Sequence, residues 1–277
     1  MVKRFISYYF EGFSTKSLVN KAKLTAFTLA ETLIVMGIIG VVAALTIPNL
    51  NSSTNNMEKV TKVKKIYAQL TEAHERATAI YGPVENWFVE NGSILNDRNA
   101  EKRYFDRITE FMKLQKTCRD AKNNCTADSK VLTLASDESD SRNANQYVPQ
   151  AVLADGTAII EIQIPYKRCT EPAHYYDTSK LSCGGITVDI DGPNKGKNTY
   201  GIDLFHFLII RDGIVPSYPG MYLEANGINA CTYMGECTGW ILEKGNLDYL
   251  LVNHDNSGTY TCSNTNQTLT WEKGSCK

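Results

Sequence analysis

The chain has 277 residues, which is enough for one sizeable hydrophobic core or two small ones. Its formal net charge is −1, and this balance excludes the strongly basic face that a nucleic-acid-binding domain needs. The charge is unevenly placed, because residues 1–26 hold five basic side chains and one acidic one while the remainder is acidic. A basic start of this kind predicts a cytoplasmic N-terminus ahead of a membrane segment.

Residues 27–47 form the one long apolar run, FTLAETLIVMGIIGVVAALTI. As a helix these 21 residues would span about 31 Å, close to the roughly 30 Å hydrocarbon core of a bilayer. Glu31 is the only charged side chain in the run. A secretory signal peptide cut near Ala44 is the competing interpretation, but the run is long for a signal core and a signal peptide has no use for a carboxylate there. We therefore predict a transmembrane helix.

A second helical pattern follows Pro48 and a polar stretch. Mostly apolar side chains recur there at spacings of three and four, as on one face of an amphipathic helix. The positions on this stripe are Val60, Val63, Tyr67, Leu70, His74, Ala77 and Tyr81. Gly82-Pro83 predicts the end of the helix. The sequence thus predicts one long helix, with 27–47 as its transmembrane half and 48–82 as an amphipathic half. We expect the stripe to pack on the protein's own sheet, with a helix of another subunit as the alternative.

Residues 83–277 are predicted to form an extracytoplasmic globular domain. A second helix is expected at 99–117, and the polar stretch 119–146 is expected to be mostly loop. Asp155-Gly156 and Asp212-Gly213 each separate two short apolar runs, which is a strong hairpin signal. The predicted strands are 151–153, 157–164, 205–210, 214–215, 240–242, 249–252, 259–262 and 268–271. The predicted fold is therefore α+β, with a long N-terminal helix packed on an antiparallel sheet.

All eight cysteines come after the apolar run. They are Cys118, Cys125, Cys169, Cys183, Cys231, Cys237, Cys262 and Cys276. An even number confined to this region indicates an oxidising compartment and disulfide-closed loops, and the absence of a C-x-x-C motif disfavours zinc. Eight cysteines allow 105 pairings, of which pairing each cysteine with its neighbour in the chain is the simplest.

A turn-rich segment, residues 188–203, carries several oxygen-bearing side chains. They are Asp189, Asp191, Asn194, Asn198 and Asp203. Hard oxygen ligands on a loop suit Ca²⁺, although the spacing is not that of an EF-hand and no Glu closes the loop. The alternative is an ordinary loop, because Asp, Asn, Gly and Pro are the usual turn residues.

No catalytic constellation stands out in the sequence. The four histidines, His74, His174, His206 and His254, are isolated, and no Ser or Cys stands in a nucleophile motif. The sequence has no glycine-rich phosphate-binding loop of the G-x-x-x-x-G-K-[ST] type. We therefore expect a chain that is not an enzyme, with a hydrolase as a remote alternative.

The segment KAKLTAFTLAETLIVMGIIGVVAALTIP resembles the N-terminus of type IV pilins and type II secretion pseudopilins. In that family a basic leader is cut before a Phe that becomes N-methylated, the fifth mature residue is Glu, and the twenty-second is often Pro. Counted from Phe27, the fifth residue is Glu31 and the twenty-second is Pro48. The resemblance covers about residues 21–50 and implies a leader at 1–26, cleavage between Ala26 and Phe27, and methylation of Phe27. Ala26 stands where the family commonly has Gly.

The resemblance also implies a function, a location and partners. The chain would be a structural subunit of a type IV pilus or a type II secretion pseudopilus, polymerised through its N-terminal helix. It would cross the bacterial inner membrane once with its N-terminus in the cytoplasm and then join a periplasmic or cell-surface filament. Its partners would be prepilin peptidase, other pilin or pseudopilin subunits, and the inner-membrane assembly platform with its ATPase. A membrane-anchored extracytoplasmic binding domain that does not polymerise is the alternative.

Two finer expectations follow from the same family. A C-terminal loop closed by a disulfide recurs in pilins, which suits Cys262 and Cys276, and some pseudopilins carry a calcium loop in the general region of 188–203. Cleavage would also free the amine of Phe27 in or near the membrane. Glu31 of one subunit would neutralise that amine on its neighbour, because an unpaired charge in a low dielectric is the costlier state.

Overall fold

The computed structural model describes residues 29–119, 125, 149–165, 169–173, 177–193, 195, 198–217, 231, 237–254 and 259–277. The predicted leader and the cleavage site at Ala26 and Phe27 lie outside these residues, as does most of the predicted loop 119–146. The chain divides into two compact units, Met1–Leu50 and Asn51–Lys277, and each is described by itself.

One helix, α1 (Leu29–Tyr81), contains the described part of the apolar run and the amphipathic pattern that follows it. Pro48 lies within this helix, and Gly82, with a positive φ of 78°, ends it as predicted. The predicted stripe is mostly correct, because Val60, Val63, Leu70, His74 and Ala77 are buried. Tyr81 differs, being 36% exposed at the end of the helix.

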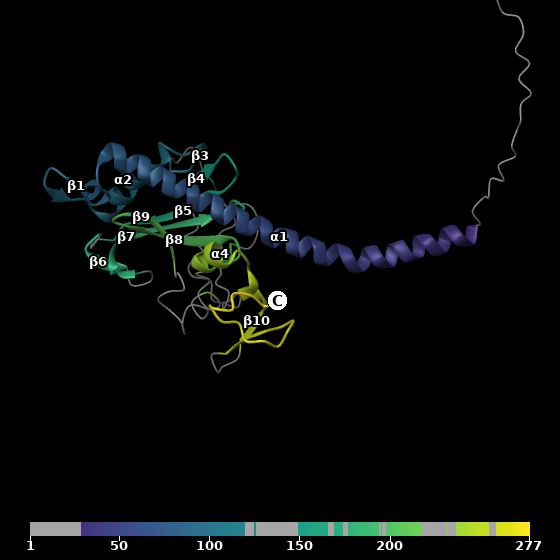
Figure 1. Cartoon of the computed structure of the whole chain (residues 1–277). Helices are drawn as coiled ribbons and strands as arrows, with labels where there is room; N and C mark the ends of the chain where they lie inside the picture. The colour runs from purple at the N-terminus through teal and green to yellow at the C-terminus, as the bar shows by residue number, and fades with distance from the viewer. Residues whose placement is uncertain are drawn as a thin grey trace, which may run out of the picture. The chain divides into compact units, whose positions relative to one another are not determined.

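The globular unit adds short helices and strands to the second half of α1 (Figure 1). The helices are η1 (Val84–Phe88), α2 (Asp97–Thr109), α4 (Thr238–Lys244) and η4 (Asp248–Leu251). The strands are β1 (Val89–Glu90), β2 (Ser93–Ile94), β3 (Leu114–Thr117), β4 (Ala151–Leu153), β5 (Ala158–Gln163), β6 (Glu171–Ala173), β7 (Asp177–Asp189), β8 (Leu204–Ile210), β9 (Gly213–Pro216), β10 (Val252–His254) and β11 (Tyr260–Cys262).

Within the described residues, seven strands form one antiparallel sheet in the order β3-β4-β5-β7-β8-β9, with β6 pairing beside β7. The α+β class and the antiparallel sheet are therefore confirmed. Both predicted Asp-Gly hairpins are present, since β4 pairs with β5 across Asp155-Gly156 and β8 pairs with β9 across Asp212-Gly213. Between β4 and β5, the backbone N–H of Thr157 donates to Asp155 Oδ1 at 3.1 Å, which is the local bond an Asp turn supplies.

Figure 1 shows α1 lying across the sheet in this unit. The rings of Tyr67 on α1 and Phe207 on β8 stack at 5.9 Å, and Tyr67 Oη donates to Ile214 O at 3.4 Å. Alternate residues of β8, Phe205, Phe207 and Ile209, belong to the same hydrophobic core as the α1 stripe. The expectation that the stripe packs on the chain's own sheet is confirmed.

Four predicted elements are wrong or only partly correct. Of the strand expected at 249–252, residues 249–251 belong to the 3-10 helix η4 and only Val252 lies in a strand, β10. The helix expected at 99–117 ends at Thr109 and is followed by β3, because Leu114–Thr117 pairs with β4. The strand expected at 240–242 is part of the helix α4, which ends at Gly245 with a left-handed φ of 67°. Of 268–271, only Thr268 makes an isolated bridge, to Thr261.

The local pairing of the cysteines is confirmed. Four disulfides join neighbouring cysteines, namely Cys118–Cys125, Cys169–Cys183, Cys231–Cys237 and Cys262–Cys276. The last bridge joins β11 to the residue before the C-terminus, and the Cys276 N–H donates to Asp248 Oδ2 at 2.8 Å. This bond fixes the C-terminal segment to η4.

Candidate functional site

The first part of α1, residues 29–42 of the apolar run, is exposed on all sides, unlike the described helices of the globular unit. All residues from 29 to 42 are exposed, among them Leu29, Leu33, Ile34, Met36, Ile38 and Ile39. A Cβ added at Gly37 or Gly40 would meet nothing within 4 Å. A helix that is apolar on all sides is normally surrounded by other apolar material, and among the described residues this segment presents an exposed apolar surface.

No helix, as far as its residues are described, holds a stretch long and apolar enough to cross a membrane. The transmembrane assignment of 27–47 stays a prediction from the sequence, and part of that range lies outside the described residues.

Glu31 lies in the first turn of α1 and is exposed. The positive end of the helix dipole favours a carboxylate at such a position. Phe27, the predicted source of a neighbouring amine, lies outside the described residues, so a Glu31–Phe27 pair stays a prediction.

Of the predicted calcium ligands, the structure describes Asp189, Asp191, Asn198 and Asp203. Asp189 Oδ1 accepts hydrogen bonds from the N–H groups of Asp191 at 3.0 Å and Gly192 at 2.9 Å, as in an ordinary turn. Asp203 is buried and accepts a hydrogen bond from the N–H of Thr199. Burial raises the pKa of Asp203 to about 6, and the nearby Asp191 acts in the same direction.

Among the described residues, no group of three or more His, Cys, Asp or Glu side chains is placed to hold a metal. Asn198 is buried with a positive φ of 50°, which also suits a turn, and Asn194 lies outside the described residues. The hydrogen bonds of Asp189 are those of a turn, whereas Asp191 Oδ1 is a buried oxygen with no hydrogen-bond partner in the described structure, so calcium binding by 188–203 stays a prediction.

Two of the four histidines, His74 and His206, are fully described. His74 is buried, its Nδ1 lies 2.9 Å from Tyr104 Oη, and its ring contacts Trp87. His206 Nδ1 lies 3.2 Å from Thr187 Oγ1. Burial lowers the pKa of each imidazole to about 4. His174 and the side chain of His254 lie outside the described residues.

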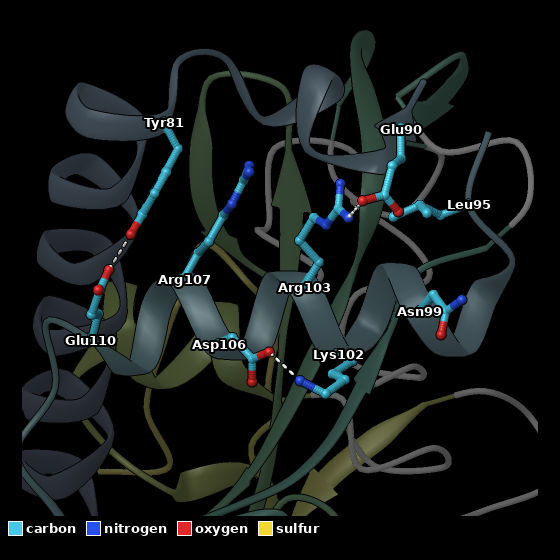
Figure 2. A pocket seen from close by; sticks show the side chains of 9 residues that line it. All are labelled: Tyr81, Glu90, Leu95, Asn99, Lys102, Arg103, Asp106, Arg107 and Glu110. Carbon is cyan, nitrogen blue, oxygen red and sulfur yellow. Dashed lines mark hydrogen bonds and ion pairs between the residues drawn. The ribbon is translucent and has the colours of Figure 1, made fainter. Parts of the chain in front are cut away.

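A polar pocket of about 750 Å³, which the sequence did not reveal, lies between the end of α1, the β1–β2 hairpin and α2 (Figure 2). It is lined by Tyr81, Glu90, Leu95, Asn99, Lys102, Arg103, Asp106, Arg107 and Glu110. Asn99, Arg103 and Arg107 are spaced by four residues and therefore share one face of α2. No spacing signal predicted this pocket, because Tyr81 comes from a different helix.

The three carboxylates of this pocket each have a partner. Glu90 Oε1 accepts from Arg103 Nη2 at 2.9 Å, and Asp106 Oδ2 accepts from Lys102 Nζ at 2.6 Å. Tyr81 Oη donates to Glu110 Oε2 at 2.5 Å, and this bond raises the pKa of the Tyr81 phenol. Figure 2 shows these three bonds as dashed lines along the face of α2.

Arg107 is held differently. Its guanidinium carbon lies 4.6 Å from the centre of the Tyr81 ring and 5.1 Å from that of Trp87, which are cation–π distances. Nη1 is buried and has no hydrogen-bond partner in the described structure. Burial lowers the pKa of Arg107, and the like charge of Arg103 adds to that effect.

Comparisons with protein-family models, with curated proteins and with solved structures each found no match for this chain.

Proposed function

We propose that this chain is a type IV pilin-like structural subunit, cut between Ala26 and Phe27 and polymerised through its N-terminal helix. The observation that carries the proposal is the segment 29–42, a helix exposed and apolar on all sides with Glu31 as its single charge. Glu31 and Pro48 also stand at the fifth and twenty-second positions counted from the expected new N-terminus. Apolar composition alone would not place both.

The physical reason for assembly is that the apolar side chains of 29–42 are exposed in the described structure. In the bilayer, lipid tails would cover them; in a filament, the same helix of neighbouring subunits would do so. Either environment has a low dielectric, in which a lone carboxylate costs several kcal/mol. The amine of Phe27, freed by cleavage on an adjacent copy, would supply the opposite charge. A filament with its subunits in the correct register would therefore be more stable than one with its subunits misaligned.

The globular unit suits an envelope location outside the cytoplasm. Its four disulfides persist only under oxidising conditions, and each stabilises by restricting the unfolded chain. The proposed partners are prepilin peptidase, other pilin or pseudopilin subunits, and the membrane assembly platform with its ATPase. The proposed role is structural rather than catalytic.

Mass spectrometry of the mature N-terminus, taken from sheared surface material, tests the processing step. We expect a chain that begins at N-methylated Phe27. A protein that keeps residues 1–26 would instead indicate the alternative, a binding domain on a passive anchor. The polar pocket at α2 is the feature that favours this alternative.

Assembly is tested separately with Glu31→Leu. We expect this variant to insert and to be cleaved but to yield no filaments, because the amine of the neighbouring Phe27 loses its counter-charge. Thr32→Leu is the matched control: it introduces the same side chain one position along the exposed helix and should assemble. Filaments at normal yield from Glu31→Leu would contradict the proposed role.

A further inference from the structure

The pocket at α2 has one charged group whose bonding capacity is unused. Glu90, Asp106 and Glu110 are each bonded to another side chain of the pocket wall, and these bonds also occupy Arg103, Lys102 and Tyr81. In the described structure the Arg107 guanidinium makes ring contacts but no hydrogen bond or ion pair. A guanidinium has five N–H donors in a planar fork, and because Nη1 is buried, the edge formed by Nε and Nη2 is the one left for a two-point bond to a ligand.

The position of Arg107 is fixed before any ligand arrives. Its guanidinium lies close to the rings of Tyr81 and Trp87. The Tyr81 ring is held in turn by its bond to Glu110, and Trp87 Nε1 donates to Gly82 O at 2.8 Å. Figure 2 shows the side chain rising from α2 into the space between Tyr81 and Arg103, with no dashed line ending on it. A group held in this way loses little freedom on binding.

The size and lining of the pocket narrow the class of ligand. A volume of about 750 Å³ falls within the range of small-molecule sites and exceeds what a single inorganic ion needs. The lining includes the Asn99 amide and several charged groups, so a ligand rich in hydroxyls would find partners where an apolar one would not.

The charge of the pocket wall narrows the class of ligand further. Three basic and three acidic side chains line the pocket, so their formal charges cancel. One additional negative charge next to Arg107 and Arg103 would relieve the repulsion between these two cations, whereas a dianion would also approach Glu90 and Glu110 closely. Arginine and carboxylate match in a planar two-bond geometry.

We propose that this pocket binds the carboxylate of a sugar-sized ligand, a uronic acid in chemical class, with Arg107 as the group that receives the carboxylate. Arg103 is placed to reinforce the charge, and Asn99 lies on the same face of α2 for the ligand's hydroxyls. The site lies wholly within the globular unit, so the inference does not depend on whether the chain polymerises.

The test is a titration of the full chain in detergent micelles with D-glucuronate, followed by saturation-transfer difference NMR. D-glucose serves as the neutral comparator and inorganic phosphate as the multiply charged one. We expect saturable glucuronate binding with a Kd of about 1 mM or tighter, and binding at least about tenfold weaker for glucose and phosphate. Absence of saturable glucuronate binding, or equal binding of glucose or phosphate, would overturn the proposal.

Variants of α2 locate the site. Arg107→Gln should weaken glucuronate binding at least about tenfold, since it removes both the charge and the fork. Arg98→Gln is the control on the same helix, and its binding should stay within about twofold because Arg98 is exposed on α2 and does not line the pocket. Unchanged binding by Arg107→Gln, or an equal loss in Arg98→Gln, would place the ligand elsewhere and reject the site.

Thermal melts followed by circular dichroism accompany each titration. If Arg107→Gln fails to fold, Arg107→Lys decides the question, because lysine keeps the charge but cannot form the planar two-bond contact. We expect Arg107→Lys to fold and to bind glucuronate about threefold to tenfold more weakly than the wild type. Wild-type affinity in a folded Arg107→Lys protein would reject the role of the guanidinium fork.

Discussion

Residues 29–42 and residues 60–77 belong to one helix, α1, yet the apolar side chains are exposed in the first segment and buried in the second. In the later segment the apolar residues are confined to a stripe and buried against the sheet, so Leu70 is 1% exposed. In the earlier segment they cover every side of the helix, and Leu33 is 64% exposed. A stripe needs apolar surroundings on one face only, which the chain's own sheet supplies, whereas a helix that is apolar all round needs them on every side.

The sharpest test of this comparison is a matched pair of leucine substitutions. Leu70→Ala should lower the free energy of unfolding by about 2–5 kcal/mol, because it leaves a cavity in the core. Leu33→Ala should change it by less than about 0.5 kcal/mol, since the side chain contributes little to that core. Urea denaturation followed by the fluorescence of Trp87, Trp240 and Trp271 measures both.

The globular unit also differs from the apolar segment because it contains disulfides. Replacing Cys262 and Cys276 by Ser should lower the free energy of unfolding by about 3 kcal/mol. Their disulfide closes a loop with a sequence separation of 14, and a longer closed loop restricts the unfolded chain more. Replacing Cys118 and Cys125, with a separation of 7, should cost about 2 kcal/mol. The same denaturation assay compares the two variants, and the reverse order would contradict the loop-entropy explanation.

The buried side of α1 should also be sensitive to pH, through His74. Its pKa is about 4 in the folded protein and near 6.5 when unfolded, so between these values the unfolded state binds more protons. The contribution of His74 to the free energy of unfolding is therefore fully present above pH 6.5. It is lost as the pH falls towards 4, by up to about 3 kcal/mol.

His74→Phe isolates this contribution. The titrations of His206 and Asp203 are common to both proteins, and the raised pKa of Asp203 acts in the opposite sense, lowering stability as the pH rises through about 6. Urea titrations at pH 7 and pH 4 should show a smaller loss for His74→Phe than for the wild type. An equal loss in both would exclude His74 as a source of acid sensitivity.

The smallest effect on the free energy of unfolding is expected from the exposed ion pairs on the solvent side of α1. Lys65 Nζ lies 2.6 Å from Asp155 Oδ2 in the β4–β5 turn, and about half of the lysine side chain is exposed. Lys65→Met should therefore cost less than about 1 kcal/mol, and the cost should shrink in high salt. Lys62→Met, which breaks a pair with Glu58 on α1 itself, should cost about 0.5 kcal/mol or less. A larger loss for Lys62→Met would show that the link to the sheet is not what matters.

Local patterns predicted the elements that depend on neighbours in the sequence. The stripe of α1, its end at Gly82, the two Asp-Gly hairpins and the four disulfides all agree with the structure. The predicted strand at 240–242 failed because Trp240 and Ile241 belong to a short apolar run whose length suits either conformation.

The central strand β7 and the pocket at α2 were missed for a tertiary reason. Gly184-Gly185 weakens the strand pattern of 177–189, yet β5 and β8 hold these residues in the sheet. The need for Gly185 becomes visible only in three dimensions, since a Cβ there would lie 2.4 Å from the His206 ring. Arg107 likewise acquires its setting from Tyr81 and Trp87, which no spacing along α2 could reveal.

The disulfides have a mechanical consequence for a chain that is pulled from its two ends. An extended residue spans roughly 3.4 Å, so a segment of 14 residues holds about 48 Å of chain length. Because Cys262–Cys276 and Cys169–Cys183 each close a separation of 14 residues, that length stays locked even after the surrounding strands give way. Under tension the globular unit would therefore lengthen less than an uncrosslinked chain of the same size, and the closed loops would act as built-in limits on its extension.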